Sequence, residues 1–188
     1  MTETERNSWI SKRPNEILIH GPSKLYIDKY LWFDPTEGII SCYTTQSKDT
    51  ADHFDIFRGV DIIESAGQTG VSACAIMESV KQDKSIDELK KHFRLAFVGM
   101  GKARFHGFVK VNETLLNVCK IHQHKFRQML ISSKVYKAPA GMDVAEYFKE
   151  LRIEKIDQLQ VPEGFMLVAE MEDMIGRSVP IGKVYPNP

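Results

Sequence analysis

Two strand-like stretches near the N-terminus flank a tight turn. Residues 24–33 (KLYIDKYLWF) and 39–45 (IISCYTT) are rich in aromatic and β-branched side chains, which favour strands. Residues 34–38 (DPTEG) lie between them and combine the residue types of a turn. The pattern predicts an antiparallel hairpin.

Residues 60–80 have a helical period and are apolar on almost every side. One face carries Val60, Ile63, Gly67, Val71, Cys74 and Met77, and the opposite side carries Ile62, Ala66, Ala73, Ile76 and Val80. A helix that is hydrophobic nearly all round belongs inside a protein rather than on its surface. We therefore predict a long, buried, central helix.

The predicted helix has one narrow polar strip and two glycines. The strip consists of Asp61, Glu64, Ser65, Gln68 and Ser72. Gly67 and Gly70 weaken a helix intrinsically. We therefore expect another backbone to approach closely there, such as the same helix of a second subunit.

The remainder of the chain alternates between strand-like and polar stretches. Residues 81–91 (KQDKSIDELKK) form a solvated segment, and strand character returns at 94–109, 114–135 and 164–176. Between the last two, Asp143 can cap a helix that carries Val144, Phe148 and Leu151 on one face and ends before Pro162.

This order of elements predicts an α+β fold in which an antiparallel sheet wraps around a long central helix. No internal repeat or low-complexity linker interrupts the sequence, so we expect a single domain over residues 1–188. Residues 1–15 are expected to be a flexible N-terminus, and residues 136–163 a helical insertion before the last strand.

Composition narrows the classes of partner and the compartment. The 25 basic residues balance the 25 acidic ones, so no overall field recruits nucleic acid or anionic lipid. The three cysteines are odd in number and lack metal-ligand spacing, as expected for buried, reduced thiols. The N-terminus is polar, and no apolar run approaches the ~20 residues that span a bilayer. We expect a soluble cytoplasmic protein that does not insert into membranes.

One segment combines a histidine, a glycine and a carboxylate at distinctive spacing. In residues 53–68 (HFDIFRGVDIIESAGQ), His53 lies eleven residues before Glu64, with Gly59 and Val60 between them and Gln68 one turn beyond. Glu64 is unusual because of its position near the start of an otherwise apolar helix. An unpaired carboxylate in such a position is costly, which points to a function.

With three further segments in the same order, this stretch resembles the hot-dog-fold 3-hydroxyacyl-(acyl carrier protein) dehydratases of fatty acid synthesis. Residues 17–35 are similar to the family's leading segment, with His20 and Asp28 at the family's spacing. Residues 97–115 resemble its third segment, including Arg104 and Phe105, and residues 168–176 its closing strand.

The sequence also departs from the family's pattern in two places. The interval between the histidine and the glutamate is three residues shorter here, and Arg58 replaces the proline before Gly59. Residues 136–163 are longer than the family's turn, which suggests a specialised branch, such as a pathway for an unusual acyl chain.

The resemblance implies a reaction and a set of roles. The substrate would be a 3-hydroxyacyl thioester on the phosphopantetheine of an acyl carrier protein, dehydrated to a trans-2-enoyl thioester in fatty-acid or polyketide-like biosynthesis. His53 would be the base, and Glu64, kept protonated by burial, the acid. Gly59 and Val60 would bind the thioester oxygen through free helix N–H groups, and Gln68 would orient Glu64.

In the family, the histidine and glutamate of one site come from different subunits. The resemblance therefore implies a homodimer or a higher oligomer of dimers. It requires no metal or redox cofactor, since the phosphopantetheine belongs to the substrate.

Each candidate residue also has a structural interpretation. His53 could be structural, Glu64 could pair with a buried cation, and Gln68 could close a structural hydrogen bond. His122 and His124, two apart on a strand, should face the same side but lack a third metal ligand. His20 and His106 are interpreted as structural. Three basic residues form either a rim for the carrier protein or solvated strand ends: Lys102, Arg104 and Lys110.

Two other functions compete with the dehydratase. One is a hot-dog acyl thioesterase, in which a helix carboxylate activates water to cleave the thioester. The other is a non-catalytic acyl-binding partner subunit, favoured by the shortened loop at residues 55–57 and the amphipathic insertion.

Overall fold

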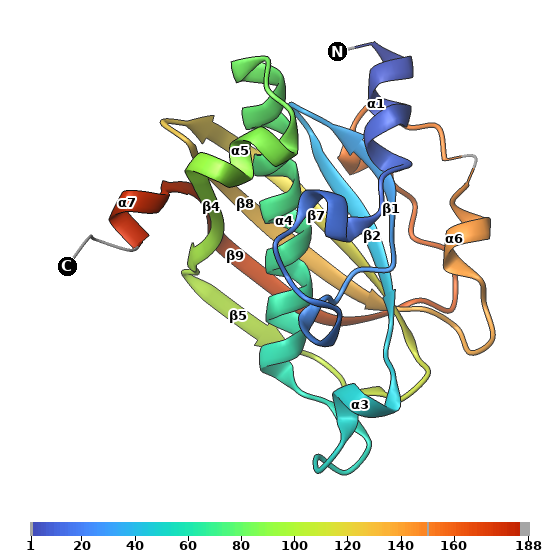
Figure 1. Cartoon of the computed structure of the whole chain (residues 1–188). Helices are drawn as coiled ribbons and strands as arrows, with labels where there is room; N and C mark the ends of the chain where they lie inside the picture. The colour runs from blue at the N-terminus through green and yellow to red at the C-terminus, as the bar shows by residue number, and fades with distance from the viewer. Residues whose placement is uncertain (1, 150, 185–188) are drawn as a thin grey trace.

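The computed structural model describes residues 2–149 and 151–184, and its elements follow the predicted order (Figure 1). The helices are α1 (Glu3–Ile10), α2 (Pro14–Ile17), η1 (Pro22–Lys24), α3 (Ser47–Thr50), α4 (Gly59–Gln82), α5 (Ile86–His92), α6 (Val144–Tyr147), η2 (Ile156–Gln158) and α7 (Ile181–Val184). The strands are β1 (Lys29–Asp34), β2 (Gly38–Thr44), β3 (Ile56–Phe57), β4 (Phe93–Gly99), β5 (Lys102–Phe105), β6 (Val109–Lys110), β7 (Thr114–Lys125), β8 (Gln128–Lys137) and β9 (Met166–Pro180).

A seven-stranded antiparallel sheet curls around α4, as the sequence predicted (Figure 1). Its order is β1-β2-β7-β8-β9-β4, with β5 also paired to β9, and β3 and β6 form a separate two-stranded ribbon. The fold class is therefore α+β, with the long helix enclosed by the sheet. No helix within the described residues is long and apolar enough to cross a membrane.

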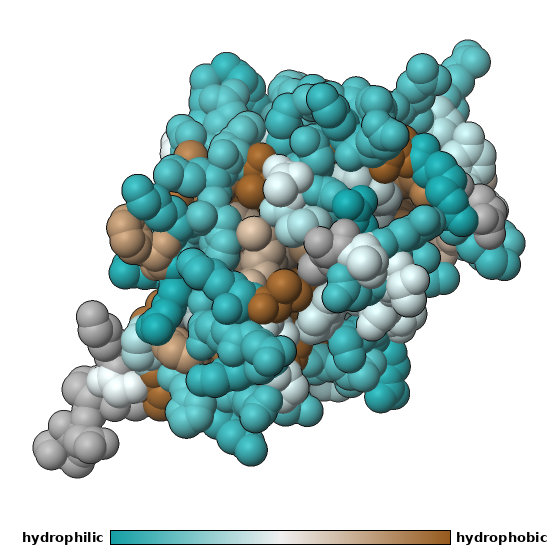
Figure 2. All heavy atoms as spheres, turned by 90° about the horizontal axis from the view of Figure 1, so that it is seen from above, coloured by the Kyte–Doolittle hydropathy of each residue, from teal (hydrophilic) through white to brown (hydrophobic). Residues whose placement is uncertain are grey.

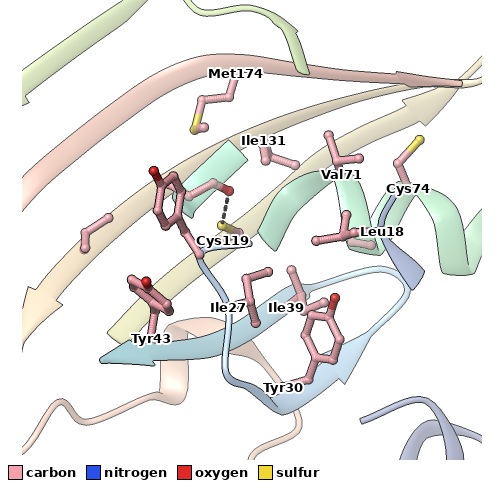
Figure 3. Packing of buried hydrophobic residues seen from close by; sticks show 14 of the residues in the cluster. Leu18, Ile27, Tyr30, Ile39, Tyr43, Val71, Cys74, Cys119, Ile131 and Met174 are labelled. Carbon is pink, nitrogen blue, oxygen red and sulfur yellow. Dashed lines mark hydrogen bonds between the residues drawn. The ribbon is translucent and has the colours of Figure 1, made fainter. Parts of the chain in front are cut away.

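The main core lies between α4 and the concave face of the sheet. Side chains of the hairpin, the central strands and α4 point toward one another there, including Ile39, Tyr43, Val71, Cys74, Cys119, Ile131 and Met174 (Figure 3). The all-round apolar character of α4 is explained by this position, because strands and the leading segment surround it. Viewed from above, the outer surface is mostly hydrophilic, with small apolar patches (Figure 2).

A second apolar cluster covers the convex face of the sheet. Leu115 belongs to the main core and Leu116 to this second cluster, because neighbouring strand residues point to opposite faces. The insertion supplies the covering layer: Phe148 and Ile156 pack there, and the indole N–H of Trp32 donates to the carbonyl of Ile153 (3.2 Å). The insertion thus gives the sheet two buried faces.

The two edges of the sheet differ in their cover. Residues 30–34 of β1 are all buried, beneath α1 and the insertion, and Arg6 of α1 pairs with Asp34 at 3.0 Å. Strands β4 and β5 at the other edge are mostly half-buried or exposed, and Val98 is 50% exposed. Among the described residues, the β4–β5 edge is therefore the more exposed of the two.

The local predictions had mixed outcomes. Helix α1 lies in the N-terminal segment that was expected to be flexible. Residues 81–91 are mostly exposed, as predicted for a solvated segment, and α5 begins within them. The predicted strand at 114–135 is a hairpin, which turns at Phe126 and Arg127. Asp143 caps α6 and the helix ends before Pro162, as predicted, but it stops at Tyr147 and so does not include Leu151.

The two glycines of α4 make room for side chains of the sheet rather than for the backbone of a second helix. A Cβ on Gly67 would lie 3.2 Å from the ring of Phe97, and one on Gly70 would lie 1.9 Å from the end of Ile131. Both neighbours belong to the sheet of the same chain. The expected close approach of another helix is not what occupies these positions.

Candidate functional site

His53 lies in a strained loop between α3 and β3. Its neighbours Asp52, Phe54 and Asp55 all have left-handed backbone angles, with φ of 59°, 55° and 56°. Such angles are costly for non-glycine residues and collect at functional sites. Phe54, at the tip of this loop, is 92% exposed.

The loop fixes the tautomer of His53. Its Nδ1 lies 3.1 Å from the carbonyl oxygen of Ile56, whose own N–H donates back to the carbonyl of His53 (3.0 Å). Because a carbonyl oxygen only accepts, Nδ1 carries the proton and Nε2 is left as a free acceptor. An imidazole held in this way can take a proton.

An aromatic cluster packs next to this loop. The rings of Tyr26, Tyr43 and Phe57 pack against one another, and Tyr43 donates a hydrogen bond to Asp49 of α3. Burial, aided by the nearby charge of Asp61, raises the pKa of Tyr26 to about 12. Both phenols are therefore protonated donors at neutral pH.

Glu64 lies on the second turn of α4, and its side chain is 39% exposed. Gln68 donates a hydrogen bond to its Oε1 (2.9 Å), and Nε2 of His20 lies 3.4 Å from the same oxygen. Within the described residues, no hydrogen bond or ion pair reaches Oε2. The expected burial of Glu64 in an apolar tunnel is wrong for the single chain, because no tunnel wall covers it.

Gln68 does more than contact Glu64. Its Nε2 also donates to the carbonyl of Lys24 (2.7 Å), and its Oε1 accepts from the backbone N–H of Tyr26 (2.9 Å). Both interpretations of Gln68 thus have a geometric basis, since it closes structural hydrogen bonds and contacts Glu64 at once.

Gly59 and Val60 open α4, as the sequence predicted. The N–H groups of Asp61 and Ile62 donate to the carbonyl of Arg58, whereas those of Gly59 and Val60 have no partner among the described residues. The ring of Phe105 packs against Gly59, 3.1 Å from where its Cβ would be. In this structure, the close neighbour that Gly59 admits is therefore Phe105.

The structure brings Glu64 and Gln68 together with His20 rather than with His53. No hydrogen bond or ion pair joins His53 to Glu64 in the part of the chain that is described. The contact of His20 with Glu64 was not predicted, although His20 lies in a segment that resembles the family. The 960 Å³ groove formed by α1, β1 and residues 145–149 and 151–154 contains none of the candidate residues.

The other candidate residues have ordinary partners. His106 lies 3.1 Å from Glu170, and Arg104 lies 3.2 Å from Glu172, which partly neutralises the proposed basic rim. His122 contacts Ser132. A bulge between residues 121 and 123 shifts the alternation of β7, so His124 instead faces α4 and lies 3.1 Å from Glu78. The predicted shared face of the two histidines is wrong, and no metal-ligand cluster occurs among the described residues.

The chain has the hot-dog fold, as comparison with solved structures shows. No protein-family model and no curated protein matches the sequence. One chain of the dehydratase heterocomplex ApeI:P from Xenorhabdus doucetiae superposes with a TM-score of 0.62 at 5% identity, over 94% of this chain and 99% of that one. At such low identity, the likeness shows the fold and nothing finer.

Two further solved structures align less well. An uncharacterised protein, PH1136, from Pyrococcus horikoshii has a TM-score of 0.49 at 13% identity, over 85% of this chain and 89% of its own. The PaaI protein of the Escherichia coli phenylacetic acid degradation operon has a TM-score of 0.47 at 7% identity, over 80% and 78%.

Proposed function

We propose that this protein dehydrates a 3-hydroxyacyl thioester, carried on the phosphopantetheine of an acyl carrier protein, to a trans-2-enoyl thioester. One observation carries the proposal: two acid–base groups each keep one heteroatom free while the other is held. His53 is held through Nδ1 and keeps Nε2, and Glu64 is held through Oε1 and keeps Oε2. Elimination of water needs one such acceptor and one such donor.

The proposed step balances with these two groups alone. Nε2 of His53 takes the proton from C2, and the C2–H electron pair forms the C2–C3 double bond. The C3–O bond breaks, and a proton from Oε2 of Glu64 completes the departing water. A donor hydrogen-bonded to Oε1 leaves Oε2 as the oxygen that carries the transferable proton.

The opening turn of α4 would stabilise charge on the thioester oxygen. The N–H groups of Gly59 and Val60 have no partner among the described residues, and they lie at the positive end of a 24-residue helix. The ring of Phe105 covers Gly59, so it has to shift for a thioester to reach that N–H.

A second copy of the chain would complete the site. Among the described residues, His53 does not contact its own Glu64, and the edge of the sheet at β4 and β5 is the more exposed one. Pairing of two such edges extends the sheet and lets each subunit offer its histidine to the other's glutamate. We therefore propose a homodimer as the minimal active unit, with no metal or redox cofactor.

An acyl thioesterase is the second candidate, favoured by the exposure of Glu64. Its side chain is 39% exposed in the single chain, where a carboxylate could activate water against the thioester carbonyl. A non-catalytic acyl-binding subunit is the third. The Xenorhabdus doucetiae neighbour belongs to a dehydratase heterocomplex, ApeI:P, which supports considering a role as one subunit of a larger assembly.

Incubation of the protein with a 3-hydroxyacyl thioester of an acyl carrier protein separates the three. New enoyl absorbance supports dehydration, release of free thiol supports hydrolysis, and an unaltered, tightly held thioester in mass spectra supports binding alone. Burial raises the pKa of Cys42, Cys74 and Cys119 to about 12, so the protein's own thiols do not react in a thiol assay.

Two variants test the roles, with a third as control. His53→Ala and Glu64→Gln should each lower the rate of hydration of a crotonyl thioester roughly 100- to 10,000-fold with the fold intact. His122→Ala, on the outer face of β7, should retain activity. Near-normal turnover in either of the first two removes that residue from the mechanism.

A further inference from the structure

Apart from Glu64, the polar strip of α4 forms contacts within the chain that stabilise the fold. Ser65 donates to the carbonyl of Tyr26 (2.8 Å), and Ser72 shares a 2.7 Å hydrogen bond with the hydroxyl of Tyr30. Gln68 binds the backbone at residues 24 and 26. These bonds fasten the segment before β1 along the helix, so His20, at the start of that segment, is carried alongside α4.

His20 is held in place from both sides. Before it, Ile17 and Leu18 are buried in the main core; Figure 3 shows Leu18 packed among the core side chains. After it, the segment is fastened to α4 through Gln68 and Ser65. Contacts on both sides of His20 therefore hold its backbone in place against α4.

Within the described residues, Glu64 is the only group paired with His20. Nε2 lies 3.4 Å from Oε1 of Glu64, and Nδ1 is buried with no hydrogen-bond partner. A structural histidine normally satisfies both ring nitrogens when they are buried. Among the described residues, neither ring nitrogen of His20 bonds to the backbone, and Glu64 is the side chain that its Nε2 approaches.

The buried Nδ1 also decides where the imidazole proton lies. A proton on Nδ1 would be a buried donor with no acceptor, which is costly. The neutral ring therefore carries its proton on Nε2, facing Oε1 of Glu64. At 3.4 Å the contact is longer than a tight hydrogen bond, as acid–base contacts often are before substrate binds.

We propose that His20 is a positioning residue for Glu64. Its Nε2–H and the amide N–H of Gln68 together hold Oε1, which aims Oε2 at the substrate. This inference rests on the proposed function only in that Glu64 is the group acting on the acyl thioester. His20 itself does not touch the substrate.

Kinetics of matched variants test the role. His20→Ala should lower kcat about 10- to 100-fold with KM changed less than about threefold, because the misplaced acid affects the reaction more than binding. His20→Gln places an amide N–H near the lost Nε2–H and should restore most of the rate. Unchanged kcat in His20→Ala, or equal loss in both variants, overturns the proposal, and His122→Ala serves as the control.

Nitrogen NMR tests the contact without any assay of activity. In ¹⁵N-labelled protein, long-range ¹H–¹⁵N spectra should show His20 protonated at Nε2, and Glu64→Ala should shift that nitrogen while leaving His122 unmoved. A proton on Nδ1, or no response to Glu64→Ala, overturns the proposal. If the wild type forms no enoyl product, the proposed function fails, while the spectra still decide the pairing of His20 with Glu64.

Discussion

The side-chain N–H of Gln68 donates a 2.9 Å hydrogen bond to Oε1 of Glu64, one helical turn earlier on α4. The same amide also binds backbone groups of Lys24 and Tyr26. The candidate acid is thus attached to a residue that holds the leading segment against the helix. Gln68 is central to both the fold and the site, and Glu64 mainly to the site.

Removal of Gln68 should therefore cost stability as well as activity. In Gln68→Ala, the N–H of Tyr26 and the carbonyl of Lys24 lose their partner inside the protein, so we expect a loss of about 2–4 kcal/mol in the free energy of unfolding. Glu64→Ala, at a half-exposed position, should lose less than about 1 kcal/mol. Urea unfolding followed by circular dichroism measures both, and equal losses would contradict this division of roles.

We expect the insertion at residues 136–163 to stabilise the fold rather than to act on the site. Phe148 is buried in the cluster on the convex face of the sheet, and Phe148→Ala should lower the free energy of unfolding by about 3–5 kcal/mol. The neighbouring Tyr147 is exposed, so Tyr147→Ala should be nearly neutral. Because the cluster lies on the opposite face from α4, kcat of folded Phe148→Ala should match the wild type. A large fall in kcat at full folding would show that the insertion acts on the site.

The sequence predicted the elements that depend on side-chain periodicity. The apolar period of residues 60–80 located α4 to within two residues at each end, and the turn residues at 34–38 located the β1–β2 hairpin. Elements that are marked by features other than apolar periodicity were not predicted. Ser85 and Glu88 form a capping box at the start of α5, a pattern readable from sequence, whereas Phe126 and Arg127 turn the β7–β8 hairpin without glycine.

The site was harder to predict because contacts between distant residues decide it. Gln68 and Glu64 are four apart on one helix, so their contact followed from spacing. His20 reaches Glu64 only through the path of the leading segment along α4. A one-residue bulge in β7 turns His124 to the opposite face from His122, and no spacing rule reveals a bulge.

The more exposed β4–β5 edge should be the contact between subunits. Val98 is half exposed on β4, and a charge there should prevent edge-to-edge pairing, so Val98→Glu should convert a dimer to a monomer and lower activity. Phe126→Glu, at the tip of the β7–β8 hairpin, should leave the dimer intact. Light scattering after size exclusion measures the mass. A monomeric wild type, or a dimeric Val98→Glu, would contradict this assignment.

Near the far end of α4, the buried side chain of Glu78 lies against His124 of β7. Nε2 of His124 lies 3.1 Å from Oε1 of Glu78, with the two side chains 8% and 2% exposed, and Gln82 donates to Oε2 (2.7 Å). Burial lowers the pKa of His124 below 6.5, and it outweighs the opposing pull of Glu78. The nearby charge of Lys81 acts in the same direction as burial.

The lowered pKa of His124 makes stability fall in acid. Below about pH 6.5 the unfolded chain binds a proton at His124 that the folded chain resists. The contribution of this residue is therefore fully present above about pH 6.5 and is lost as the pH falls toward the folded pKa. His124→Gln has no such proton to bind, so its free energy of unfolding should decline less than that of the wild type between about pH 7.5 and 5.5. Urea unfolding at a series of pH values measures both, with the exposed His122→Gln expected to follow the wild type. Parallel curves for the wild type and His124→Gln would show that the titration of His124 does not contribute to stability.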